Sequence, residues 1–147
     1  MNNPILVDIK DLLIADSGTP FTFGGALDWS IHIASEPENP DNCLSLFATG
    51  GREPGLYNDP THPITEYPSF QVRLRGNNYL AVCQKLEEAR AYIQHIGSFD
   101  VTNLNGGTTT HYADILPNGH PIDLPKDKNK RFIRVMNFYA IREEVSP

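Results

Sequence analysis

The sequence predicts an α+β protein, a single domain in which a mixed, mostly antiparallel β-sheet is flanked by an N-terminal helix and one long central helix. Three observations predict this class. A segment with the alternation of a strand (67–76) leads directly into a segment with a helical period (77–96). A second amphipathic segment lies at 4–15. The 147 residues, 39% of them hydrophobic, are enough to build one genuine core.

The strand–helix unit at 67–96 is the feature around which the other segments are arranged. Phe70, Val72 and Leu74 alternate with polar residues, which is typical of a half-buried strand, and Pro68 and Gly76 bound it. In the following segment, apolar residues recur three or four positions apart, as on one face of a helix: Tyr79, Val82, Cys83, Leu86, Ala89, Tyr92, Ile93 and Ile96.

The first segment, Pro4 to Ala15, is predicted to be a helix. Ile5, Ile9 and Leu13 share one side of it, and proline suits a first helical turn. The sequence Ser-Gly at 17–18 ends it. We expect its apolar face to cover the sheet.

Strands are predicted at Ser30 to Ser35 and at Cys43 to Ala48. The segment between them, 36–42, is dense in turn-forming residues. Because two strands joined by a short turn-rich segment usually form a hairpin, we expect these two to pair antiparallel.

The C-terminal half predicts further strands at 99–104, 108–116 and 122–124, and a long one at 132–142. The last has apolar residues on both faces. Phe132, Met136 and Phe138 lie on one side, and the other side carries Ile133, Val135, Tyr139 and Ile141. This pattern indicates a strand that is covered on both sides.

Charge and cysteine content exclude several classes of function. A net charge of −6 argues against a protein that holds nucleic acid by neutralising phosphates, although it is compatible with one that lets DNA pass. Cys43 and Cys83 have no metal-binding spacing, so buried reduced thiols and an intracellular setting are expected. The first residues do not resemble a signal peptide, and no apolar run is long enough to predict a membrane span.

The glycine-rich loop that begins at Thr49 does not match a phosphate-binding loop, because GxxxxGK[ST] is absent and no helix follows. Long loops in small domains usually serve a function or contact a partner. Arg52, Tyr57 and Tyr67 are residue types enriched in protein interfaces, so this loop is a candidate contact surface.

The search for catalytic chemistry finds one grouping. His111, Asp114, His120 and Asp123 lie close in sequence, which leaves a small metal-dependent hydrolase as one alternative. Their spacing matches neither HExxH nor a zinc finger, however, and no nucleophile motif is present. We therefore expect no enzyme activity, no catalytic residue, no metal and no cofactor.

Four segments taken together resemble phage minor capsid proteins of the tail-terminator type. They are Gly50-Gly51 with Pro54, Tyr67-Pro68, Phe70-Gln-Val-Arg-Leu-Arg-Gly76 with Tyr79, and the turn Asp127 to Arg131 leading into Asn137-Phe-Tyr-Ala-Ile-Arg142. Their order and spacing carry the resemblance. Relatives often have Asp-x-x-Gly-Arg in the turn, which here lacks the glycine; Asn129 is expected to take the left-handed conformation instead. The proline-rich insertion at 57–63 has no counterpart that assigns it a role.

The resemblance implies a structural virion protein of the tail and neck, assembled in the host cytoplasm and not attached to a membrane. Such proteins form a homo-oligomeric ring, expected to be a hexamer, that caps the tail tube and joins it to the head connector, while DNA passes through the lumen without specific binding. Alternatives are another head–tail neck protein (a head-closure or tail-tube protein) or a plain binding module.

A ring of identical subunits requires two different patches that meet each other. The residues predicted to contact a neighbouring subunit or the tube, with the arginines taken as exposed, are Arg52, Tyr57, Tyr67, Arg73, Arg75, Arg131 and Arg134.

Overall fold

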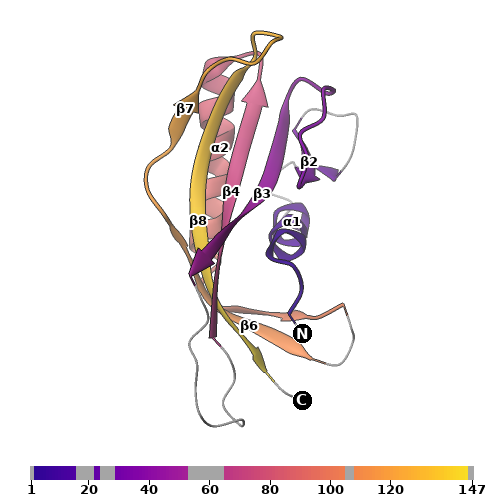
Figure 1. Ribbon diagram of the computed structural model, residues 1–147, viewed down its shortest axis with the longest axis vertical. Helices are drawn as coiled ribbons and strands as arrows, with labels where there is room; N and C mark the ends of the chain where they lie inside the picture. Colours follow the sequence, from indigo (N-terminus) through magenta and orange to yellow (C-terminus); the bar gives the residue numbers. More distant parts are fainter. Residues whose placement is uncertain (1, 16–21, 24–28, 53–64, 105–107, 146–147) are drawn as a thin grey trace.

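A strongly curved β-sheet with two helices on one face forms the framework of the protein in the computed structural model (Figure 1). The structure describes residues 2–15, 22–23, 29–52, 65–104 and 108–145. The elements in chain order are α1 (Ile5–Ala15), β1 (Thr22–Phe23), β2 (Ser30–Ile33), β3 (Cys43–Arg52), β4 (Thr65–Gly76), α2 (Tyr79–His95), β5 (Phe99–Thr102), β6 (Thr109–Pro117), β7 (Ile122–Leu124) and β8 (Phe132–Val145).

The strands lie in the order β1-β2-β3-β4-β8-β6-β5, and β7 pairs with β8 beyond the end of β6. Five pairs are antiparallel: β3–β4, β4–β8, β8–β6, β6–β5 and β7–β8. The β1–β2 and β2–β3 pairs are parallel. The sheet is therefore mixed and mostly antiparallel, and together with the two helices it confirms the α+β part of the predicted fold class.

The predicted hairpin between β2 and β3 is wrong, because these strands run parallel, with Ser30 opposite Cys43 and Ile33 opposite Leu46. The connection 34–42 returns along the strands instead of turning at their ends. Ala34 begins this return with a φ of 58°, and its N–H donates to the carbonyl of Leu46 at 2.8 Å. The buried side chains of Arg75 and Arg131 bind the rest of the connection.

The core lies between the two helices and one face of the sheet. Phe70, Val72 and Leu74 of β4 are fully buried there, as their alternation predicted, and the ring of Phe70 stacks on Phe138 of β8 at 5.4 Å. Burial of each such side chain contributes about 1.5–3 kcal/mol. The helices supply Ile5, Leu6, Ile9 and Leu13 from α1 and Val82, Leu86, Ala89 and Ile93 from α2.

The turn from β4 into α2 depends on two residues. Asn78 caps the helix, because its side-chain oxygen accepts the N–H of Ala81 at 3.1 Å. Gly76 lies so close to the connection before β3 that a Cβ there would be 2.7 Å from Oδ1 of Asn42. A larger residue at this position would therefore require the side chain of Asn42 to move.

A buried polar network, which was not predicted from the sequence, attaches α1 to the sheet. The hydroxyl of Tyr112 in β6 donates to Oδ2 of Asp8 in α1 at 2.6 Å. Arg142 of β8 donates from Nη1 to that hydroxyl at 3.0 Å and to the carbonyl of Asn3 at 2.9 Å, and from Nε to Glu66 at 2.9 Å. Burial raises the pKa of Tyr112, which therefore stays protonated and acts as the donor to Asp8.

Candidate assembly surface

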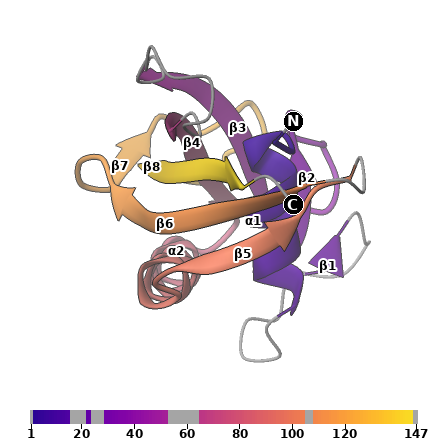
Figure 2. The ribbon, with the colours of Figure 1, turned by 90° about the horizontal axis from the view of Figure 1, so that it is seen from below.

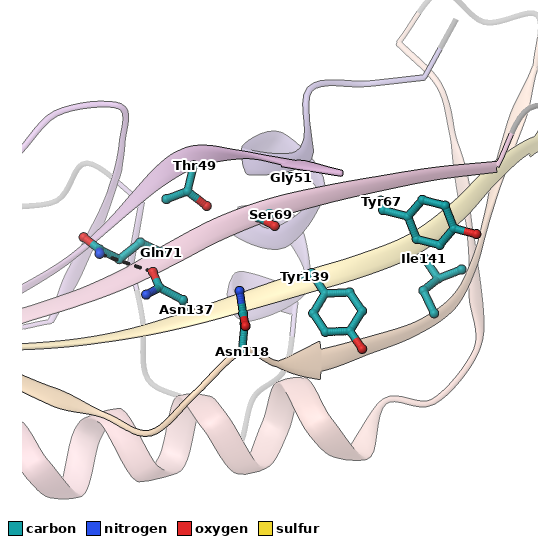
Figure 3. A pocket seen from close by; sticks show the side chains of 9 residues that line it. All are labelled: Thr49, Gly51, Tyr67, Ser69, Gln71, Asn118, Asn137, Tyr139 and Ile141. Carbon is teal, nitrogen blue, oxygen red and sulfur yellow. Dashed lines mark hydrogen bonds between the residues drawn. The ribbon is translucent and has the colours of Figure 1, made fainter. Parts of the chain in front are cut away.

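The face of the sheet turned away from both helices carries a surface pocket of about 840 Å³. We call it the outer pocket. Strands β3, β4 and β8 provide most of its walls, and Asn118, which follows β6, provides the rest (Figure 3). Its lining residues are Thr49, Gly51, Tyr67, Ser69, Gln71, Asn118, Asn137, Tyr139 and Ile141.

Alternation along β4 and β8 explains why these side chains gather on this face. Residues at even positions from Phe70 to Leu74 point into the core, so Ser69 and Gln71 point away from it. Ser69 lies opposite Tyr139, and Gln71 lies opposite Asn137. The amide of Gln71 donates from Nε2 to Oδ1 of Asn137 at 3.2 Å (Figure 3). The pocket floor therefore offers amide and hydroxyl groups beside two tyrosine rings.

The glycine pair that the sequence analysis noted shapes the rim of the outer pocket. Gly50 and Gly51 have φ values of 90° and 109°, next to a bulge in the β3–β4 pairing after Ala48. A Cβ on Gly51 would lie 2.2 Å from the carbonyl oxygen of Tyr67, so the two backbones touch there. These glycines thus allow the left-handed backbone and the close approach of β3 to β4 at this point.

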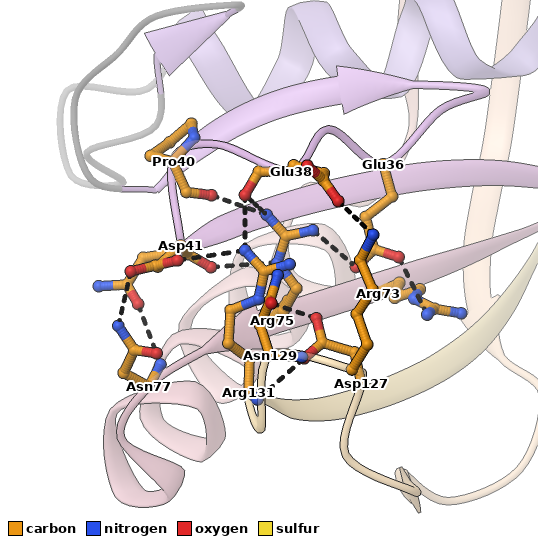
Figure 4. Close-up of polar contacts among 12 residues, drawn as sticks. Glu36, Glu38, Pro40, Asp41, Arg73, Arg75, Asn77, Asp127, Asn129 and Arg131 are labelled. Carbon is orange, nitrogen blue, oxygen red and sulfur yellow. Dashed lines mark hydrogen bonds and ion pairs between the residues drawn. The ribbon is translucent and has the colours of Figure 1, made fainter.

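Arg75 lies beneath the connection 36–41, on the same face of the sheet but at its other end. It is 2% exposed. Its Nη2 donates to the carbonyl of Pro40 at 2.7 Å and its Nε to that of Asp41 at 3.2 Å (Figure 4). Arg73 lies beside it and pairs with Glu36 at 2.9 Å.

Arg131 binds the same connection from the other side. It is 3% exposed. Its Nη1 donates to the carbonyl of Glu38 at 2.6 Å and to Oδ1 of Asp41 at 3.1 Å (Figure 4). Its Nε donates to Asp127 at 2.8 Å. The expectation that Arg75 and Arg131 are exposed is therefore wrong. The connection 36–41 covers them, and its carbonyl groups accept hydrogen bonds from their guanidinium groups.

The turn at 127–131 has a left-handed residue, but it is Lys130, with a φ of 60°, and not Asn129 as expected. Lys130 occupies the position where relatives were expected to have glycine. Oδ1 of Asp127 accepts the N–H groups of Asn129 and Arg131, each at 3.0 Å. Burial opposes ionisation of Asp127, but its hydrogen bonds with the Arg131 backbone and side chain outweigh it, so the pKa of this carboxyl is lowered.

Arg134 belongs to a separate cluster that joins β7, β8 and α2. Its Nη1 donates to Asp123 at 2.6 Å and lies 3.3 Å from the hydroxyl of Tyr79. That hydroxyl donates to Asp123 at 2.7 Å, and this hydrogen bond raises the pKa of Tyr79 to about 12. The arrangement fixes the short strand β7 against the helix.

The structure thus distributes the predicted contact residues over three places. Tyr67 lines the outer pocket, Arg73, Arg75 and Arg131 hold the 36–41 connection, and Arg134 holds β7. Arg52 pairs with Tyr67 as the last residue of β3, and Tyr57 lies outside the described residues. Contact of any of these residues with another subunit stays a prediction. Gln71, Asn137 and Tyr139 were not predicted as contact residues, although the alternation of β4 and β8 could have identified them.

The residues considered for chemistry are dispersed. Nδ1 of His111 lies 2.6 Å from Oδ1 of Asp100 on the neighbouring strand. Within the described ranges, no group of three or more His, Cys, Asp or Glu side chains could hold a metal ion. Cys43 is buried and reduced, and desolvation raises the pKa of its thiol; Cys83 is half-buried. Neither described helix is long and apolar enough to cross a membrane.

A small α+β protein with an uncharged pocket of amides and tyrosines on one sheet face has the features of a protein that assembles with other proteins. Residues 6–144 match the family model described as bacteriophage tail terminator protein, and the chain belongs to this family. No curated protein matches the sequence. The protein is accordingly a structural component of a phage tail, as the resemblance in the sequence predicted.

Proposed function

We propose that the protein caps the phage tail tube as a hexameric ring and joins the tube to the head connector, with DNA passing through the lumen. The observation that carries this proposal is the family match over 6–144, which includes every residue that lines the outer pocket. A ring also needs protein-binding surfaces on each subunit, and the outer pocket offers one.

Purified tail tubes mixed with the protein test the capping function. Electron microscopy is expected to show a ring of density at one end of each tube, and tube protein polymerised in its presence is expected to give shorter tubes than tube protein alone. Density along the whole tube, or at the head portal and not at the tube, would assign the protein to another place in the neck and contradict the proposal.

The net charge makes a second, independent test possible. A surface that grips DNA neutralises phosphates with lysine and arginine, but this chain has 12 of these residues against 18 acidic ones. Among the described arginines, Arg75 and Arg131 are moreover buried in contacts with the chain itself. In a gel-shift titration at about 50 mM salt, where such binding is strongest, we expect no retardation of duplex DNA.

A further inference from the structure

We propose that the outer pocket is the docking site for a second copy of this chain, and that Leu104 of the neighbouring subunit is part of the patch that docks there. This inference rests on the proposed function, because a ring needs a contact between two different patches of identical subunits.

The charge distribution favours a second copy as the occupant. Each chain carries a net charge of −6, so two copies repel each other wherever their acidic surfaces meet. None of the nine residues that line the outer pocket carries a charged side chain. Identical acidic subunits can therefore meet at this pocket with little electrostatic cost.

The chemistry of the pocket suits a protein partner. Tyr67 and Tyr139 place two rigid rings beside the aliphatic side chain of Ile141, and all three are half-buried. Gln71 and Asn137 add amide groups that both donate and accept hydrogen bonds. Aromatic residues with few charges are typical of the buried centre of an interface.

Leu104 fits the second patch because it is exposed and yet held in place. Its side chain is 75% exposed. Its backbone N–H donates to Oδ1 of Asn3 at 2.7 Å, and Asn3 itself is 4% exposed. Because its backbone is already held, binding of this side chain costs little additional backbone entropy.

The position of Leu104 also suits a ring. It follows β5, the last strand of the sheet on the side away from β3. Seen from below the molecule, the end of β5 lies on the side opposite β7, the short strand that continues from the pocket wall after Asn118 (Figure 2).

Charged substitutions in each patch test the contact, with association measured by analytical ultracentrifugation or native mass spectrometry. Ser69→Arg places a cation in the pocket, and Leu104→Asp places a carboxylate in the opposite patch. We expect each to weaken ring assembly at least 10-fold while the circular dichroism spectrum and Tm stay close to those of the wild type. The matched control Gln84→Arg, on the exposed side of α2, should assemble normally.

Mixing the two variants gives the sharper result. Ser69→Arg keeps an intact Leu104, and Leu104→Asp keeps an intact pocket, so each mixed pair can form one wild-type contact. The other contact of an alternating ring brings the introduced arginine to the introduced aspartate, and these opposite charges attract. We expect rings in the mixture although neither variant forms them alone. Rings in either variant alone, with wild-type affinity, would overturn the inference.

Two further outcomes are informative. If Ser69→Arg forms rings but no longer binds tubes, the pocket receives the tube protein, which overturns the inference and leaves the proposed function intact. If the wild type forms no ring either alone or on tubes, the proposed function fails and the inference fails with it.

Should Ser69→Arg not fold, Ser69→Cys in a Cys83→Ser background provides the measurement. Cys43 is buried, so maleimide reports on position 69. Labelling at least 10-fold slower in the ring than in the dilute subunit is expected, and equal rates would refute the contact.

Discussion

Lys130 holds the left-handed position of the 127–131 turn, with a φ of 60°. An L-residue other than glycine, asparagine or aspartate is strained there by about 1 kcal/mol, because its Cβ approaches the following carbonyl. We expect Lys130→Gly to raise the free energy of unfolding by about 0.5–1 kcal/mol, measured by urea denaturation. The neighbouring change Asn129→Gly, at a residue without a positive φ, is the control and should be neutral or destabilising. Equal effects of the two changes would show that the turn is not strained at Lys130.

Asp127 in the same turn should make stability depend on pH. Its pKa is lowered from the usual 3.8 in the folded chain, so the folded state favours the ionised form. The corresponding stability is present above the unfolded pKa and is lost as the pH falls through the folded pKa. We expect the difference in Tm between the wild type and Asp127→Asn to be largest near pH 6 and to shrink below about pH 4. A difference that stays constant down to pH 3 would contradict this.

Substitution of Arg75 or Arg131 should lower the stability of the single folded chain, whatever its effect on assembly. Each is buried and donates to carbonyls of the 36–41 connection. Reversing such a buried charge leaves the carbonyl groups of the connection without hydrogen-bond donors. Arg75→Glu or Arg131→Glu should therefore destabilise the chain by about 3 kcal/mol or more. The exposed control, Lys128→Glu, should change stability far less, since exposed pairs are worth about 0–1 kcal/mol. Denaturant titration measures all three, and folded monomers of wild-type stability would instead favour an interface role for the arginines.

These arginines show what a residue pattern can predict. Alternation along β4 correctly placed Arg73 and Arg75 on the face opposite the core. It could not predict that a connection more than thirty residues earlier in the chain, 36–41, covers that end of the face. The burial of a polar strand face is decided by long-range contacts, which leave no periodic pattern in the strand itself.

At the scale of elements, helix α1 depends on a polar contact as well as on its apolar face. The hydroxyl of Tyr112 donates to the buried carboxylate of Asp8. Tyr112→Phe leaves that carboxylate with one donor fewer, so we expect a loss of about 1–3 kcal/mol in the free energy of unfolding. Tyr139→Phe makes the same chemical change beside the outer pocket and should cost under about 0.5 kcal/mol in the unassembled subunit. A similar loss in both variants would mean that the hydrogen bond to Asp8 does not stabilise the fold more than the hydroxyl of Tyr139 does.

Most elements could be predicted from the sequence because their periods are local. The segments around α1, β4, α2, β6 and β8 lie where alternation or helical spacing placed them. The parallel pairing of β2 with β3 could not be predicted, since the favoured hairpin depends on turn residues alone, whereas the real path depends on Ala34 and the distant arginines. Strand β1, only two residues long, is too short for a period.

At the scale of the whole molecule, the candidate site was predicted only in part. Tyr67 was predicted as a contact residue but the residues beside it on β8 were not, because a pocket shared by three strands requires knowledge of strand order. The family resemblance depends instead on the order and spacing of segments, and the family match over 6–144 confirms it. It assigns no contact to any residue of the outer pocket, so that role stays a prediction.

The net charge of −6 leads to a prediction about the assembled state. If subunits meet at the uncharged outer pocket, the main electrostatic term between them is repulsion between their acidic surfaces. Salt shortens the Debye length from about 30 Å at 0.01 M to about 8 Å at 0.15 M, which screens this repulsion. We therefore expect the association constant of the ring, measured by sedimentation, to rise with salt over this range. An interface built on exposed arginines and acidic partners would respond in the opposite way, because salt screens attraction between ion pairs. A tenfold fall in association over this range would thus place the subunit contact away from the outer pocket.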